Sequence, residues 1–329
     1  MENKSENKVS LREKIAALSA DRSNLYKILC IVLLVILIVT LGSCGLTMYS
    51  RNLAYRAYQN LADQVNQVPD SNMNGSDAWG TEQTEHTTEV LETESEEETE
   101  SDTEEEEETE EEDTLTEENL IEQLGLTVPK KNLDWEEIHK VNPDIYAWIY
   151  IPNTEVEYPI LQHPTDDNYY LNRNMDGSFG KPGCIFTQSL NHKDFLDLNT
   201  VVYGHNMKSG RMFQSVHDFE DREFFDRNRY IYVYTEERVL IYEIFAAYMT
   251  DDSHILNTND FTTVEGYEQY LEKVKRESQA GNFREDINVT AMNRILTLST
   301  CGTRSHQRYL VQGVLLNDPI LYGLLSADN

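Results

Sequence analysis

Short apolar runs separated by polar turn residues recur along the second half of the chain. Each run is rich in β-branched and aromatic residues, and turn residues such as Pro152-Asn153 and Lys181-Pro182-Gly183 bound them. The runs cover residues 147–151, 156–161, 184–187, 200–203, 230–234, 239–248, 295–299 and 309–316. Eight such strands are enough to close on themselves, so the pattern predicts a mostly β fold, an eight-stranded closed barrel of antiparallel type.

Helical patterns flank and interrupt these strands. One set of apolar residues recurs at i, i+3 and i+4 spacing and predicts an amphipathic helix up to about Gln279, between the sixth and seventh strands: Val264, Tyr267, Tyr270, Leu271 and Val274. Before the first strand, residues 116–124 read as helix. Asp134 is the expected N-cap of a second helix, which Asn142-Pro143 ends.

A continuous apolar segment lies near the N-terminus. Residues 28–50 contain no charged side chain, and at a rise of about 1.5 Å per residue they are long enough to cross a hydrocarbon core of about 30 Å. Six basic residues precede the segment, and only Arg51 and Arg56 follow it before Lys130. This charge distribution predicts a cytoplasmic N-terminus (1–27), a transmembrane helix (28–50) and an extracellular remainder. A cleavable signal and lipidation at Cys44 are the alternatives.

Charge divides the remainder of the chain. Residues 70–118 hold 23 Asp or Glu and no Lys or Arg, so they carry most of the formal net charge of −32. Because this stretch also has few large apolar residues, it predicts a disordered acidic stalk over 51–114, followed by a single domain over 115–329. A docking site for a basic partner is the alternative role. The strongly acidic composition excludes a nucleic-acid-binding role.

The most informative chemistry lies at strand ends. The predicted strand ending in Thr297-Leu298-Ser299-Thr300-Cys301 is followed seven residues later by Arg308, and an upstream strand ends in Tyr203-Gly204-His205-Asn206. A strand end holds a nucleophile rigidly and leaves it open to substrate. These strings resemble the sortases, and the helical lead-in and the long helix before the seventh strand resemble class B. The resemblance covers residues from about 132 to about 316.

The resemblance implies a role for each residue at these strand ends. Cys301 is the expected nucleophile, His205 the acid and base, and Arg308 the donor to the oxyanion; the neighbouring Ser299, Thr300 and Asn206 are expected to contact substrate. His306 is the rival base, since a turn would bring it back over the thiol, and Arg304 is the rival arginine. Cys184 is assigned to packing, although a regulatory disulfide with Cys301 stays open.

A membrane-anchored transpeptidase is therefore the expected function. In sortases, a thioester acyl-enzyme forms on the C-terminal sorting signal of a secreted protein, and an amine of the lipid-linked cell-wall precursor resolves it. This chemistry requires no metal and no cofactor. A pilin polymerase that uses a pilin lysine is the alternative within the family. A non-catalytic adhesin and a papain-like protease are alternatives outside it; the protease would place its cysteine at a helix N-terminus.

Overall fold

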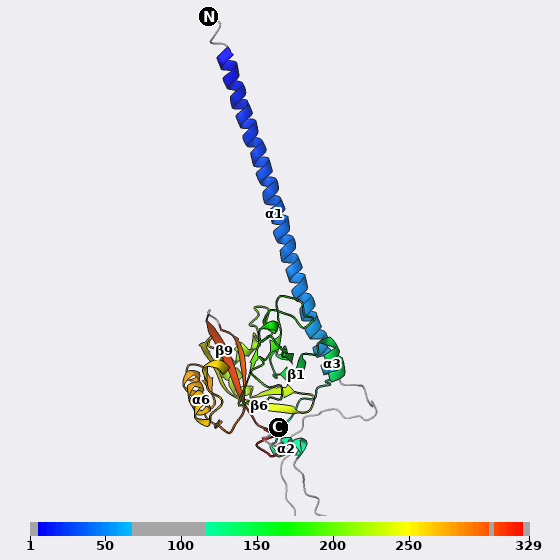
Figure 1. The fold of residues 1–329 in the computed structure, drawn as a ribbon, viewed down its shortest axis with the longest axis vertical. Coiled ribbons are helices and arrows are strands. Elements are labelled where there is room, and N and C mark those ends of the chain that lie inside the picture. Colours follow the sequence, from blue (N-terminus) through cyan, green and yellow to red (C-terminus); the bar gives the residue numbers. More distant parts are fainter. Residues whose placement is uncertain (1–5, 68–115, 303–305, 325–329) are drawn as a thin grey trace, which may run out of the picture.

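A closed β-barrel forms the body of the molecule, and one long helix leaves it (Figure 1). The computed structural model describes residues 6–67, 116–302 and 306–324. Its helices are α1 (Glu6–Asn66), α2 (Glu117–Gln123), α3 (Trp135–Val141), α4 (Arg222–Arg227), α5 (Ile255–Thr258) and α6 (Val264–Ser278). Its strands are β1 (Ile145–Tyr150), β2 (Glu157–Leu161), β3 (Ile185–Phe186), β4 (Asn199–Tyr203), β5 (Tyr230–Tyr234), β6 (Val239–Asp251), β7 (Asn282–Phe283), β8 (Ile295–Cys301) and β9 (Gln307–Leu315).

Eight strands close the barrel in the order β5-β1-β2-β3-β4-β8-β9-β6, and β6 pairs back onto β5. These are the eight predicted runs, so the predicted mostly β barrel is confirmed. The added strand β7 pairs with Ala246 and Ala247, in the middle of β6. The antiparallel expectation was wrong for two pairs, because β2 pairs with β3 and β4 with β8 in parallel. The long connections 162–184 and 204–294 provide the crossovers that parallel pairing requires.

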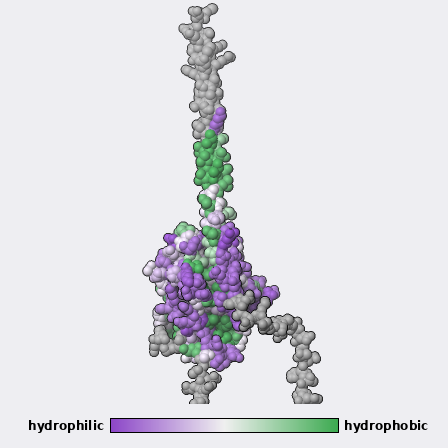
Figure 2. Space-filling view, turned by 90° about the vertical axis from the view of Figure 1, so that its right-hand side faces the viewer, coloured by the Kyte–Doolittle hydropathy of each residue, from purple (hydrophilic) through white to green (hydrophobic). Residues whose placement is uncertain are grey.

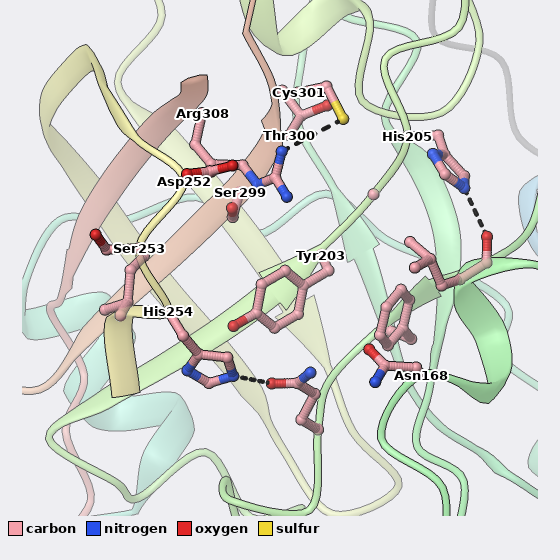
Figure 3. A pocket seen from close by; sticks show the side chains of 15 residues that line it. Asn168, Tyr203, His205, Asp252, Ser253, His254, Ser299, Thr300, Cys301 and Arg308 are labelled. Atoms are coloured by element: carbon pink, nitrogen blue, oxygen red, sulfur yellow. Dashed lines mark hydrogen bonds between the residues drawn. The ribbon is translucent and has the colours of Figure 1, made fainter. Parts of the chain in front are cut away.

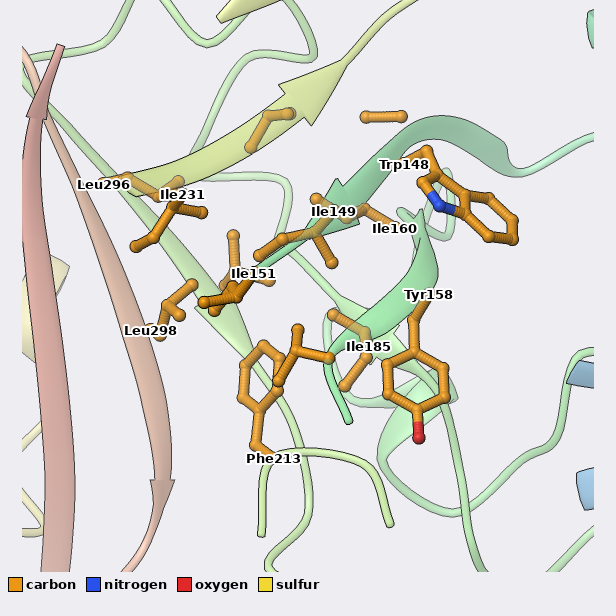
Figure 4. Close-up of a cluster of buried hydrophobic side chains, with 14 of the residues drawn as sticks. Trp148, Ile149, Ile151, Tyr158, Ile160, Ile185, Phe213, Ile231, Leu296 and Leu298 are labelled. Atoms are coloured by element: carbon orange, nitrogen blue, oxygen red, sulfur yellow. The ribbon is translucent and has the colours of Figure 1, made fainter. Parts of the chain in front are cut away.

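The barrel interior is an apolar core. Inward side chains of neighbouring strands, among them Ile149, Ile160 and Leu298, are fully buried and converge with Phe213 from a connecting loop (Figure 4). On the outside, α6 lies between β6 and β8 in the chain, as predicted. It buries Tyr267, Tyr270 and Val274 against β6 and β9. This packing holds the ends of β4, β8 and β9 rigidly, which matters because the candidate site lies there.

The N-terminal lead-in contains the two helices predicted before the first strand. Thr116 accepts a hydrogen bond from Asn119 N and begins α2, while Asp134 accepts one from Glu137 N and begins α3. Asn142 ends α3 in an extended conformation. Helix α2 therefore lies within the predicted range 116–124, and Asp134 is the N-cap of α3 as expected.

Helix α1 extends beyond the predicted membrane segment. It contains a stretch long and apolar enough to cross a membrane, and Figure 2 shows this apolar belt just above the domain. The helix then continues to Asn66, whereas the sequence predicted a disordered stalk from residue 51. The reason is a second apolar stripe, Ala54, Tyr58, Leu61 and Val65, which is buried against the barrel domain at helical spacing.

The rest of the predicted stalk, residues 68–114, lies outside the described residues. Its two flanks, however, both lie on the domain. The carbonyl of Val65 accepts a hydrogen bond from Asn132 N at 2.8 Å, and the Glu117 carboxylate accepts one from Val239 N at 3.3 Å. The described residues on both sides of the acidic segment therefore contact the domain, and α1 itself connects the domain to its apolar belt.

Candidate active site

Cys301 is the last residue of β8, and the strand holds its backbone in place. Residues 295–300 are buried, whereas Cys301 is exposed. Antiparallel β9 flanks the strand on one side, and parallel β4 flanks it on the other as far as the Tyr203–Ser299 pair. The thiol therefore emerges from a rigid, hydrogen-bonded base at the point where the sheet ends.

Arg308 lies opposite Cys301 in the β8–β9 register. Directly paired residues on adjacent strands point their side chains to the same face, so the two side chains meet. The Nη1 atom of Arg308 lies 3.7 Å from the Sγ atom of Cys301 (Figure 3). A fixed cation at this distance stabilises a thiolate and any negative charge that develops beside it. The rival Arg304 lies outside the described residues.

His205 follows β4 by two residues and faces the thiol across the cleft (Figure 3). Its Nε2 atom lies 2.6 Å from the carbonyl oxygen of Leu171. Because a carbonyl only accepts, Nε2 carries a proton, which leaves Nδ1 as the basic nitrogen of the neutral ring. Burial lowers the pKa of His205, and the charges of Lys181 and Arg308 lower it further, against the hydrogen bond to Leu171.

A glycine makes room for this ring. Gly183 has a φ of +72°, and a Cβ atom there would lie 2.9 Å from the Leu171 carbonyl oxygen and 3.2 Å from Cδ2 of His205. A larger residue at this position would displace the imidazole or the carbonyl that holds it. The loop before β3 therefore helps to fix the position of His205, together with strand β4, which ends two residues before it.

A cleft of about 180 Å³ connects these residues. Its lining includes Cys301, Arg308 and His205 together with Ser299 and Thr300, two of the expected substrate contacts. The described residues that complete the lining are Asn168, Leu171, Phe186, Gln188, Tyr203, Gly204, Asp252, Ser253, His254 and Ile255. Three buried polar atoms in this lining have no hydrogen-bond partner: Tyr203 OH, Thr300 Oγ1 and His254 Nδ1. Unpaired buried polar atoms in a cleft are candidates for bonds to a ligand.

Asn206, the third expected substrate contact, is placed beside this cleft and bonds to the backbone of the thiol residue. Its Nδ2 atom donates to the Cys301 carbonyl at 3.1 Å and lies 3.0 Å from Nε2 of His217. Nε2 of His217 also lies 3.1 Å from the Cys301 carbonyl oxygen, and its Nδ1 atom lies 2.6 Å from the Glu220 carboxylate. The ring also stacks on Tyr309. His217 therefore orients the amide that holds the Cys301 carbonyl.

We expect His217→Ala to lower turnover about five- to tenfold, the value of about one hydrogen bond, with little change in KM. His217→Gln keeps a polar side chain that can bond to Asn206 or to the Cys301 carbonyl, and should recover part of the loss. His192→Ala is the matched control, because His192 is also paired to a carboxylate but its side chain is 80% exposed at the surface. Steady-state kinetics check this, and a Gln variant no better than the Ala variant would contradict the role.

His306 and Cys184 lie near this cleft but make other contacts. His306 has an 84% exposed side chain that pairs with Asp252. Cys184 is buried and bonded to the Tyr58 hydroxyl at 3.0 Å, and burial raises the pKa of its thiol to about 12. The sequence analysis singled out neither His217 nor His254, yet both lie at the site. Neither residue lies on a strand or in a recognisable motif, because both lie in long connections between strands.

Comparison with known proteins agrees with this architecture. The sortase family model, described as a sortase domain, matches residues 149–316. Sortase B of Listeria monocytogenes is 35% identical over 183 residues, which are 55% of this chain and 73% of that protein. Sortase B of Staphylococcus aureus is 32% identical over 167 residues, covering 51% and 67%.

Solved structures show the same relationship. The crystal structure of Clostridium perfringens sortase B superposes with a TM-score of 0.51 at 31% identity, over 56% of this chain and all of that one. A substrate complex of Staphylococcus aureus sortase B gives 0.51 at 28% identity, over 61% and 91%. The fold is that of the sortases, a family of cysteine transpeptidases. The chain belongs to the sortase family, and within it to class B.

Proposed function

We propose that Cys301, His205 and Arg308 are the catalytic residues of this transpeptidase, and that it joins secreted proteins carrying a C-terminal sorting signal to an amine of the cell-wall precursor. The observation that most strongly supports this proposal is the strand register that holds the Arg308 guanidinium 3.7 Å from the Cys301 thiol, in one cleft with His205. A non-catalytic adhesin would not need this arrangement.

Acylation begins with the thiolate of Cys301. The thiolate, not the thiol, is the nucleophilic form of a cysteine, and the Arg308 guanidinium lies beside this sulfur. The sulfur attacks the carbonyl carbon of the scissile peptide bond, and the carbonyl oxygen takes the negative charge. Protonated His205 gives its proton to the departing amine, which leaves a thioester on Cys301.

Arg308 is the donor to the oxyanion. Its guanidinium lies beside the sulfur, so an oxygen on the attacked carbon comes within its reach. Planar, fixed donors stabilise a developing charge because they need no reorganisation during the reaction. The second half-reaction reverses the roles: neutral His205 removes a proton from the incoming amine, which attacks the thioester and frees Cys301.

The cleft also provides contacts for the sorting signal. Tyr203 and Thr300 supply hydroxyl groups, and His254 a ring nitrogen, that have no partner in the described structure. Polar groups of the peptide satisfy them, and a peptide that lacks those groups leaves them buried and unpaired. Selection among peptides therefore arises mainly from this part of the cleft.

The cellular placement follows from α1. Its apolar segment is the membrane anchor, and the basic residues before it indicate a cytoplasmic N-terminus with the catalytic domain outside the cell. Outside the membrane, the domain meets both the secreted protein and the lipid-linked wall precursor.

The test is incubation of the protein with a panel of sorting-signal peptides, with and without candidate amines. A transpeptidase releases the C-terminal fragment and forms a new amide with the amine, and hydrolysis replaces transfer when the amine is omitted. A wall-precursor amine should be accepted better than a peptide lysine; the reverse preference would favour the pilin-polymerase alternative. Absence of cleavage across the panel would count against the proposal.

Arg308→Lys should lower turnover about a hundredfold while changing peptide affinity much less. The lysine keeps a charge but loses the fixed fork of donors, and an oxyanion donor is worth about 3 kcal/mol. Arg238→Lys is the matched control, because this residue pairs with Glu237 away from the cleft. Kinetics with melting temperatures check the result, and equal small effects in both variants would remove Arg308 from the mechanism.

A further inference from the structure

The distance between the apolar belt of α1 and the catalytic domain is very short. The uncharged segment ends at Ser50, and Ala54 is already buried against the domain, about 6 Å further along the helix axis at about 1.5 Å per residue. Because α1 is one continuous helix, it acts as a rigid connection. A domain packed this close to the belt reaches the headgroup region of a bilayer that α1 crosses.

The helix packs against the loops of the active-site end. The Tyr58 hydroxyl donates to the carbonyl of Gly183 at 2.8 Å, and the guanidinium of Arg211 lies 3.3 Å from the ring centroid of Tyr55. Gly183 precedes β3, which is antiparallel to β4, and Arg211 lies in the loop after β4. Both loops therefore lie at the same end of the sheet as His205 and Cys301, and Figure 1 shows that end on the side from which α1 leaves.

These two loops, residues 173–183 and 206–212, have an unusual surface for so acidic a chain. Together they carry four basic residues, Arg173, Lys181, Lys208 and Arg211, and one acidic residue, Asp176. Between the first two basic residues, Phe179 has 78% of its surface exposed, and the Arg173 guanidinium lies 5.9 Å from its ring. Basic side chains with an exposed aromatic ring are the surface chemistry that fits anionic headgroups and the boundary below them.

We propose that these loops form a membrane-contact surface, and that α1 holds the active-site end of the barrel against the anionic lipid surface. The contact needs α1 to cross the membrane, but it needs no catalytic role for any residue. It means that substrates are taken at the bilayer surface. It also assigns the acidic segment 68–115 no part in setting the height of the domain, since both of its flanks lie on the domain.

The test places an environment-sensitive fluorophore on the full-length chain in bilayer nanodiscs. Phe179→Cys and Met292→Cys carry the probe in a background of Cys30→Ser, Cys44→Ser and Cys301→Ala, where the remaining Cys184 is buried. Met292 is the matched control: it is 69% exposed and precedes β8, at the opposite end of that strand from Cys301. Lipids with a nitroxide near the headgroup quench the probe in nanodiscs of phosphatidylglycerol mixed with phosphatidylcholine, and of phosphatidylcholine alone.

The proposal predicts quenching at position 179 several-fold stronger than at position 292 in the phosphatidylglycerol nanodiscs, with the difference reduced by salt and by neutral lipid. Equal quenching at the two positions would overturn the membrane contact. A difference in quenching that does not change with lipid charge or salt would overturn the proposal that the loops contact anionic lipids. Because the background lacks the thiol of Cys301, neither result depends on whether the protein is a transpeptidase.

Discussion

Cys301→Ala abolishes both cleavage of sorting-signal peptides and transfer to an amine, with a loss of about four orders of magnitude or more, the scale seen when a covalent nucleophile is removed. The physical reason is that Cys301 supplies the only thiol in the lining of the described cleft. Cys184 is buried and its thiol pKa is raised to about 12, so it cannot replace the missing nucleophile. Peptide cleavage and transfer, followed by chromatography, check the prediction.

The folding control for this prediction is direct. Cys301 is exposed at the end of β8, so its truncation leaves the core intact and the melting temperature should change little. Cys184→Ala is the matched cysteine variant: it removes a buried thiol and its bond to Tyr58, and should lower stability while the chemistry persists. Full transfer activity in Cys301→Ala would refute the catalytic assignment.

His205→Ala comes second in expected effect, with turnover reduced by about 10²- to 10⁴-fold, the range for a general acid and base. Both half-reactions lose activity, because the same ring protonates the departing amine and deprotonates the incoming one. A nucleophile stronger than a peptide amine should recover part of the second step, since hydroxylamine attacks a thioester without help from a base. Rapid-mixing kinetics of acylation and of thioester aminolysis separate the two losses.

His306→Ala is the control for His205→Ala. Its ring is 84% exposed and bonded to Asp252, so its removal should change turnover little. If the two variants behaved in the reverse manner, His306 would be the base and the cleft would have to rearrange around the segment 303–305.

The sequence predicted those parts of the fold that depend on local patterns of apolar and polar residues. Each of the eight strands is a short β-branched run with turn residues at its ends, and α6 shows an apolar stripe at helical spacing. Cys301, His205 and Arg308 were identified because each lies at a strand end within a recognisable string. The β8–β9 register then brought Cys301 and Arg308 to the same face, as a tight strand pair must.

What the sequence did not predict depends on contacts between distant segments. The sequence contains the apolar stripe of residues at the end of α1, namely Ala54, Tyr58, Leu61 and Val65. The stripe alone does not distinguish a packed helix from the start of a stalk, because the sequence does not show the surface that it packs against. The parallel pairs and the placement of His217 and His254 depend on how long connections cross the barrel. Local pattern contains no information on such crossings, because many paths join the same strand ends.

The most direct test of the central claim is the intact mass of the protein after brief incubation with a sorting-signal peptide that it cleaves. The account predicts a mass increase equal to the acyl part of the peptide, located on Cys301 by proteolysis, absent in Cys301→Ala and lost when an acceptor amine is added, with the amide product appearing in equal amount. Peptide cleavage without an adduct on Cys301, or an adduct that the amine does not discharge, would contradict it.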